Sequence, residues 1–174
     1  MVCLGILWNS MQEHLEDAVE DIASYGEILS LFSLDLGNNY ESFVRDIYAQ
    51  DDIAEWKVDK KVETMFECSD SREVTIVFIN IETSEIKYHS LKKRNVFVNL
   101  ENMKTEIRKK YSEIVECYFF DNIFHVTDDE KEYEADLEVI KNYCNSVAKE
   151  DIVPLSNEHI KVLKKGSSGN GIKK

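Results

Sequence analysis

His125 is the residue of this chain best placed to do chemistry. It follows an apolar run, Tyr118–Phe124, and precedes Thr127 and Asp128, either of which can cap a helix. The N–H groups left unpaired at the start of such a helix favour an anion. An imidazole at this junction can act as a general base or as a nucleophile that is transiently phosphorylated.

Asp136 is the expected partner of this histidine. It lies eleven residues later, on the next expected helix, and it faces His125 if that helix packs beside the strand. A carboxylate bonded to the second ring nitrogen would fix the tautomer of the imidazole. The alternative is a half-buried histidine whose ring is satisfied by a backbone carbonyl, and the residue pattern alone favours that alternative.

Composition and charge predict a globular domain with a packed core. Of the 174 residues, 43% are hydrophobic and 32% are charged, and the formal net charge is −13. Proteins that bind nucleic acid present a basic face, so nucleic acid is not expected as a partner of the main body of the chain. A nucleotide needs only a few local cations and remains compatible with this charge.

The cysteines and the apolar runs predict a cytoplasmic protein without membrane contact. None of the four cysteines forms a C-x-x-C pair or has a histidine at zinc-ligand spacing, so no metal site is expected. No stretch approaches the roughly 20 apolar residues of a membrane span. The opening run Val2–Trp8 lacks the basic residues that begin a signal peptide.

Alternating strands and helices are expected to position His125. The apolar pattern predicts strands at Cys3–Leu7, Ile28–Leu36, Glu73–Ile81 and Cys117–His125. Helices are expected after a cap at Asn9-Ser10 with an end at Gly26, from Tyr40 to Ile47, after a cap at Asn99, and from Asp129 to Ala148. Residues 50–70 fit either a helix or an irregular connection between elements. Ile86–His89 can either pair back with the strand before it or lead onward to the next element.

This order predicts an α+β fold, a ferredoxin-like split βαβ antiparallel sheet with helices on one face. We expect one domain over residues 1–154. Residues 155–174 carry five lysines against one glutamate and end in GSSGNGIKK, which predicts a basic Gly/Ser/Lys tail without fixed structure.

Two segments of the chain resemble nucleoside diphosphate kinases. Residues 105–108 read T-E-I-R and residues 122–128 read N-I-F-H-V-T-D, where that family has T-I-R and N-I-I-H-G-S-D. The expected order of strands and helices is also the order of that family. The resemblance extends loosely over residues 3–145 and is specific only in residues 105–136.

The resemblance implies a phosphate-handling site around His125, which would carry the phosphoryl group between nucleotides. Asn122 matches the asparagine that contacts sugar and phosphate, and Arg108 matches the arginine that holds phosphate. Thr127-Asp128 matches the family's Ser-Asp pair. Asp136 falls where the family has the glutamate that orients the histidine.

Lys92 and Arg94 are expected to help bind the phosphates. They belong to the strongest basic cluster of the acidic body, Lys92-Lys93-Arg94, in roughly the region of the family's nucleoside loop. A charged turn is the alternative interpretation. The resemblance further implies ATP or GTP with Mg²⁺ as the phosphoryl donor, and a homo-oligomeric assembly.

Two functions fit these residues. The first is a divergent nucleoside diphosphate kinase-like transferase that uses His125 as nucleophile or base. The second is a catalytically inactive interaction module that binds a protein partner through its acidic surface. The second is favoured by the sequence after the first strand, where Trp8-Asn9-Ser10 replaces the family's lysine motif. A third is an enzyme that transfers a phosphate or a nucleotide to a macromolecule.

Overall fold

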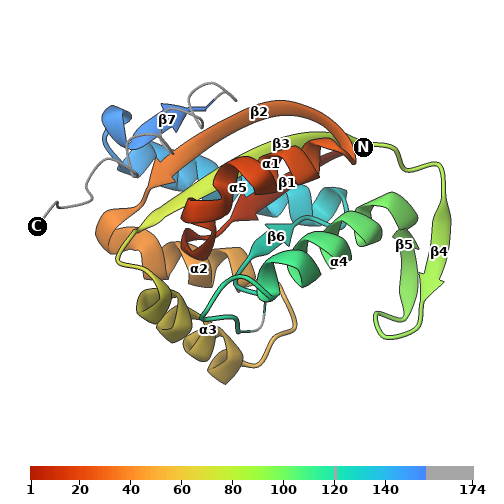
Figure 1. The fold of residues 1–174 in the computed structure, drawn as a ribbon, viewed down its shortest axis with the longest axis horizontal. Coiled ribbons are helices and arrows are strands. Elements are labelled where there is room, and N and C mark those ends of the chain that lie inside the picture. Colours follow the sequence, from red (N-terminus) through yellow and green to blue (C-terminus); the bar gives the residue numbers. More distant parts are fainter. Residues whose placement is uncertain (120, 156–174) are drawn as a thin grey trace, which may run out of the picture.

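The main sheet has five antiparallel strands in the order β6-β1-β3-β2-β7 (Figure 1). This computed structural model describes residues 1–119 and 121–155. The prediction of an α+β fold with an antiparallel sheet is confirmed, and the order of the first four strands is compatible with a ferredoxin-like arrangement. The strands are β1 (Val2–Leu7), β2 (Gly26–Asp35), β3 (Glu73–Ile81), β6 (Phe124–Val126) and β7 (Ile152–Pro154).

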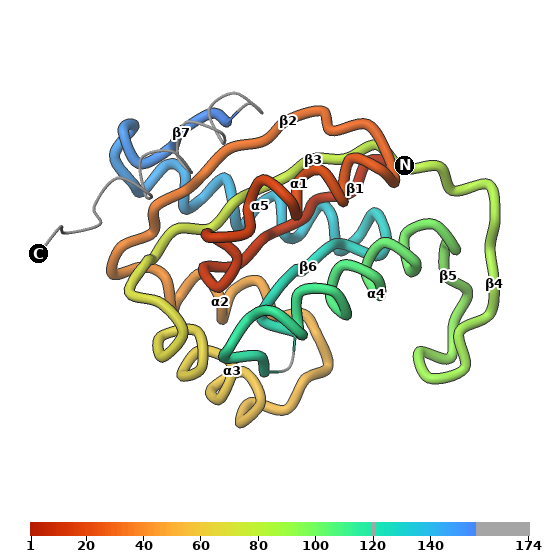
Figure 2. Tube along the Cα trace, viewed as in Figure 1, coloured from red at the N-terminus to blue at the C-terminus, as the bar shows by residue number. Residues whose placement is uncertain are grey.

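Helices lie against both faces of the sheet, as the trace in Figure 2 also shows. One face is covered by α1 (Leu15–Ala23) and α4 (Val98–Ser112). The other face is covered by α2 (Tyr40–Tyr48), α3 (Glu55–Cys68) and α5 (Glu130–Ser146). Among the described residues, no helix combines the length and the apolar character needed to cross a membrane.

The expectation of helices on one face only is wrong. Strand β1 is buried on both sides: Cys3 and Leu7 belong to the core under α1 and α4, whereas Leu4 and Ile6 belong to the core under α2, α3 and α5. A strand that is apolar at nearly every position leaves two hydrophobic faces, and each face has to be covered. The additional helices therefore follow from the continuous apolar character of β1 and β3.

The expected strand Cys117–His125 is also wrong in its extent, because β6 is the only strand among the described residues of this range. The side chain of Asn122 holds the preceding turn: its oxygen accepts from the Phe119 N–H and its nitrogen donates to the Cys117 carbonyl, at 3.2 and 2.8 Å. Asp121 has a positive φ of 58°, which a strand does not allow. The described residues before β6 therefore form a turn that is tied to the fully buried Asn122.

A separate hairpin projects from the main sheet. Within the described part of the chain, strand β4 (Ile86–His89) pairs only with β5 (Arg94–Phe97), so the segment that could have paired back leads outward instead (Figure 1). The charged residues 50–70, which the sequence left open, contain the helix α3. Strand β7 was not expected from the sequence. The predicted basic tail lies outside the described residues from residue 156 onward.

Three expected helix boundaries differ. The segment after β1 begins with a 3-10 helix, Asn9–His14, in place of a side-chain cap. Gly26 starts β2 and does not end the preceding helix, which stops at Ala23. Helix α4 begins one residue before Asn99, whose amide instead donates to the Glu82 carbonyl at 3.2 Å. In each case a tertiary contact or the following strand determines the boundary.

Gly5 allows β6 to lie close to β1, and Gly5→Ala is expected to destabilise the fold by about 1–3 kcal/mol. A Cβ at this position would be 2.7 Å from Phe124 Cε2 and 2.8 Å from Val77 Cγ1. Urea unfolding measures the change, with Ser30→Ala on the exposed part of β2 as the matched control. Equal stability of Gly5→Ala and Ser30→Ala would contradict close packing here.

Candidate active site

A pocket of about 850 Å³ opens beside the end of β6. This volume is typical of small-molecule sites. Its lining comes from α2, the connection to α3, α3, the turn of the β4–β5 hairpin, α4, β6 and α5. The basic side chains in the lining are Lys61, Lys92, Arg94, Lys104, Arg108 and Lys131. The acidic side chains are Asp51, Asp52, Asp121, Asp128, Asp129 and Glu132.

His125 lies in this pocket and is held from two sides. Its backbone pairs with Ile6 of β1, and its side chain is almost fully buried. The Nε2 atom is 2.6 Å from Oδ2 of Asp136, and the ring of Tyr48 makes an edge contact with the imidazole at a centroid distance of 5.5 Å. The sequence-predicted pairing of His125 with Asp136 is therefore present in the structure.

The buried carboxylate of Asp136 determines which ring nitrogen is available. A carboxylate only accepts hydrogen bonds, so Nε2 of His125 carries the proton and donates it to Asp136. In the neutral ring, Nδ1 then carries the lone pair. Nδ1 makes no hydrogen bond to any residue that the structure describes. The hydrogen-bond partner of the imidazole is therefore the carboxylate of Asp136, and not a backbone carbonyl as the alternative interpretation expected.

Arg108 of α4 also lines the pocket and bonds to the residue that precedes His125. Its Nε donates to the Phe124 carbonyl at 3.0 Å, and its terminal nitrogen is 2.6 Å from Oδ2 of Asp121. Burial raises the pKa of Asp121, and the charges of Arg108 and Lys61 offset only part of that effect. The guanidinium is thus fixed beside β6 with a carboxylate as its present partner.

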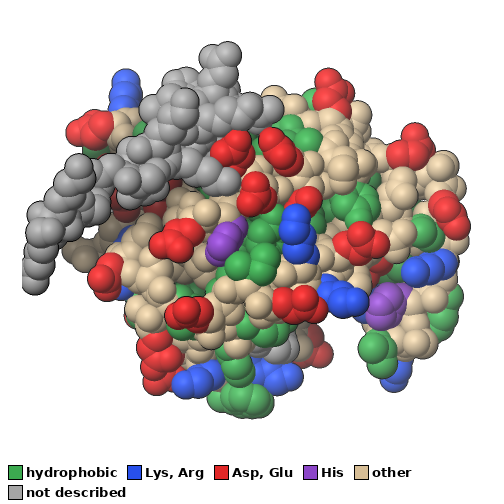
Figure 3. Space-filling view, in the orientation of Figure 1, with side chains coloured by type: hydrophobic (Ala, Val, Ile, Leu, Met, Phe, Trp, Pro, Cys, Tyr) green, Lys and Arg blue, Asp and Glu red, His purple; other side chains and the backbone are tan. Residues whose placement is uncertain are grey.

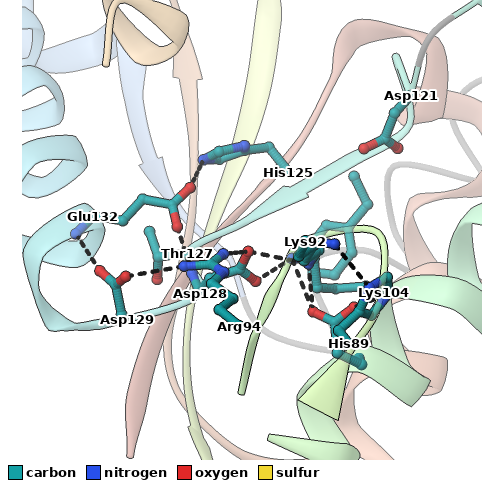
Figure 4. A network of polar contacts seen from close by, with 12 residues as sticks. His89, Lys92, Arg94, Lys104, Asp121, His125, Thr127, Asp128, Asp129 and Glu132 are labelled. Carbon is teal, nitrogen blue, oxygen red and sulfur yellow. Dashed lines mark hydrogen bonds and ion pairs between the residues drawn. The ribbon is translucent and has the colours of Figure 1, made fainter. Parts of the chain in front are cut away.

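Asp128 is the centre of an ion-pair network at the pocket rim (Figure 4). Its carboxylate accepts from Lys104, from Arg94 at 2.6 Å and from Lys92 at 3.2 Å, and Lys92 also binds Glu101 at 2.7 Å. Burial by itself raises the pKa of Asp128, but the neighbouring lysines outweigh it and hold the pKa at about 2. The network joins the hairpin to α4 and to the start of α5.

Asn122 and Thr127 lie behind the pocket and contribute nothing to its lining. Asn122 is fully buried in the turn before β6, where its side chain bonds to backbone. The Thr127 hydroxyl accepts from the Leu4 N–H at 3.1 Å, and the Thr127 N–H donates to the Leu4 carbonyl. The resemblance implies that both residues contact a ligand, but in the structure their side chains stabilise the backbone around His125.

Lys61 is a pocket residue that the sequence analysis missed. It is 1% exposed, and its Nζ donates to the Tyr48 hydroxyl at 2.6 Å and lies 4.0 Å from the Tyr48 ring centroid. Burial lowers the pKa of Lys61 to about 7. Helical spacing gives the signal that could have found it, because Lys61 shares the apolar face of Val58, Val62 and Met65.

Glu132 and Lys104 were missed for a similar reason. Both are charged residues on helices, a pattern that indicates solvated surface. Glu132 instead accepts from the Asp128 N–H at 2.6 Å and lies 4.0 Å from His125 Nε2, and Lys104 is buried beneath the hairpin turn. Acidic and basic side chains are intermixed over the face shown in Figure 3, and no patch of one sign dominates it.

A scan against models of known protein families finds no match for this chain, and no curated protein matches its sequence. The assignment of a function therefore depends on the geometry of the pocket. That geometry consists of a buried histidine oriented by a carboxylate, with a second ring nitrogen available and cations on three surrounding helices.

Proposed function

We propose that this chain is a nucleotide-binding phosphotransferase, divergent from nucleoside diphosphate kinases, that transfers a phosphoryl group through His125. The observation that carries this proposal is the 2.6 Å contact between His125 Nε2 and the buried Asp136. This contact orients the ring and leaves the Nδ1 lone pair as the nucleophile. The β6-β1-β3-β2 strand order supports the resemblance to that family.

The transfer has two balanced steps. In the first, the Nδ1 lone pair of His125 forms a bond to the γ-phosphorus while the bond to the bridging oxygen breaks, and the nucleoside diphosphate leaves with that electron pair. The positive charge that develops on the imidazole is stabilised by Asp136 through Nε2–H. In the second, an acceptor oxygen attacks the phosphorus, the N–P bond breaks, and the ring returns to its neutral form.

The size of the pocket and its basic side chains support a nucleoside triphosphate as the ligand. Its volume of about 850 Å³ suits a bound triphosphate, and six basic side chains line it beside six acidic ones. Lys61 enters from α3; burial lowers its pKa to about 7, and a bound triphosphate would favour its protonated form. Asp128 and Asp129 at the rim offer the carboxylate oxygens that Mg²⁺ prefers, and Mg²⁺ would enter as part of the substrate.

A second candidate function is a catalytically inactive interaction module. The observation that favours it is the pairing of the pocket cations: Lys92, Arg94 and Lys104 contact Asp128, and Arg108 contacts Asp121. A site neutralised by its own carboxylates does not require an anionic ligand. A triphosphate would have to exchange places with these carboxylates, so nucleotide binding separates the two functions.

Saturating ATP or GTP with Mg²⁺ is expected to raise the melting temperature of the protein. A ligand at a hundred times its dissociation constant adds about 2.7 kcal/mol to the stability of the folded state. Arg108→Gln should abolish the increase, whereas Lys109→Gln, on the exposed side of the same helix, should retain it. Failure of both nucleotides to shift the wild-type transition would contradict the transferase and favour the interaction module.

A further inference from the structure

Three side chains beside the pocket form a donor set that phosphoryl transfer does not use as a whole. His125, Glu132 and Asp136 each offer a ligand atom, and these atoms all lie within 4.8 Å of one another. The Nε2 of His125 is 2.6 Å from Asp136 Oδ2 and 4.0 Å from Glu132 Oε1 (Figure 4 shows His125 and Glu132). Such spacing is compatible with one ion bound between all three groups.

Two rigid elements hold these ligands in place. His125 belongs to β6, which is paired to β1 inside the sheet. Glu132 and Asp136 are four residues apart on α5, so their side chains project from the same side of the helix. The helix is fixed at its start by Asp129, whose carboxylate caps the Glu132 N–H at 2.9 Å. The donor set is therefore arranged before any ion binds.

A further contact orients the carboxylate of Glu132 toward His125, and burial confines that of Asp136. The Asp128 N–H donates to Glu132 Oε2, which leaves Oε1 on the side of His125. Asp136 is 2% exposed, and within the described residues its only hydrogen bond is made by Oδ2 to His125. Its Oδ1 is thus a nearly buried acceptor without a partner in this part of the chain. Outer contacts of this kind fix the ligands of metal sites.

The chemistry of the donors indicates the class of ion. One imidazole with two carboxylates carries a charge of −2, which a divalent cation balances. A mixed nitrogen and oxygen set suits Zn²⁺, Mn²⁺ or Fe²⁺ better than Ca²⁺ or Mg²⁺. Three protein ligands also leave at least one coordination position open, as in catalytic sites. Because His125 and Glu132 line the pocket, the open position faces it.

We propose that His125, Glu132 and Asp136 bind one divalent transition-metal ion, with an open coordination position facing the pocket. Binding releases the Nε2 proton to solvent, and the ion takes its place between His125 and Asp136. The Nε2 and Oδ2 atoms then separate to about 3 Å, as two ligands each about 2.1 Å from one ion require. This proposal does not depend on phosphoryl transfer.

Cobalt titration of the full chain tests the site without any nucleotide. Co²⁺ reports its ligands through visible absorption, and thiolate ligands add an intense near-ultraviolet band. We expect one Co²⁺ per chain, visible bands without the thiolate band, and complete displacement by Zn²⁺. The absence of a stoichiometric spectrum, or the presence of the thiolate band, would overturn the proposal.

Variants of α5 locate the ion. Glu132→Gln and Asp136→Asn are expected to lower the affinity for Co²⁺ by at least about 100-fold. Glu134→Gln, on the exposed side of the same helix, should bind like the wild type. Circular dichroism checks that each variant is folded, and Glu132→Gln keeps the test decisive if Asp136→Asn does not fold. Unchanged affinity in folded Glu132→Gln would contradict this site.

Discussion

Asp136→Asn is expected to lower the rate of phosphoryl transfer by about 10²- to 10⁴-fold with little change in nucleotide affinity. The carboxylate fixes the proton on Nε2 of His125, at a distance of 2.6 Å. An asparagine amide can donate to Nε2 instead, and this favours the tautomer with the proton on Nδ1. The nucleophilic lone pair is then directed away from the nucleotide. Single-turnover labelling with ATP measures the rate.

Two comparisons separate this effect from general damage to the fold. Asp136→Glu keeps the carboxylate and should recover part of the rate, whereas Glu134→Gln on the exposed side of α5 should leave the rate unchanged. A folded Asp136→Asn protein that transfers phosphate at the wild-type rate would contradict the assignment of Asp136 as the positioning residue of His125.

The stability of the protein is expected to rise by roughly 4 kcal/mol between about pH 7 and pH 10 through the titration of Lys61. Burial lowers the pKa of Lys61 to about 7 in the folded chain. The unfolded lysine has its usual pKa of about 10.4. Between these two values the unfolded chain binds a proton that the folded chain does not, so the free energy of unfolding increases with pH. Below about pH 7 this contribution is constant.

Urea unfolding at a series of pH values measures this effect against Lys61→Met. The substitution removes the buried amine, so it should stabilise the protein at pH 7. The free energy of unfolding of Lys61→Met should also lack the rise between about pH 7 and pH 10 that Lys61 causes in the wild type. Cysteines and tyrosines that titrate in the same range are present in both proteins and cancel in the comparison. Lys60→Met, an exposed neighbour paired with Glu63, is the control. Parallel profiles for wild type and Lys61→Met would show that Lys61 has an ordinary pKa.

Local patterns predicted most of the longer strands and helices, whereas β7 and the helix within residues 50–70 were not assigned from the sequence. Glu73–Ile81 has the bounds predicted from its β-branched residues. The last helix begins at Glu130 and is capped by Asp129, so the expectation that Thr127 or Asp128 caps it is wrong. The run before His125 was misassigned, because hydrophobicity alone does not distinguish a strand from a turn that contains apolar residues. The turn is stabilised by Asn122, whose side-chain amide bonds to the backbone N–H of Phe119 and the backbone carbonyl of Cys117. In a strand, these backbone groups would bond to a neighbouring strand instead.

The pairing at the centre of the site was a conditional expectation, and most of its surroundings were not predicted. Asp136 was expected to face His125 if the following helix packs beside the strand, and the structure has that packing, although the residue pattern alone favoured a backbone carbonyl as the partner of the ring. Lys92 and Arg94 line the same pocket as His125, where both contact Asp128, and their expected role in binding phosphates stays a prediction. Lys104 and Asp128 are far apart in the sequence, and only the packing of α4 against the end of β6 brings them together. Asn122 and Thr127 match the motif of the resembling family, but their side chains bond to backbone.

The most direct test of the central claim is incubation of the full chain with γ-labelled ATP or GTP and Mg²⁺, beside His125→Ala and the control His14→Ala. The account predicts a protein-bound phosphate that is labile in acid and stable in alkali, present in wild type and His14→Ala and absent in His125→Ala. Transfer of this label to an added nucleoside diphosphate would then identify the acceptor class. An unlabelled wild-type protein, or a label that persists in His125→Ala, would contradict phosphoryl transfer through His125.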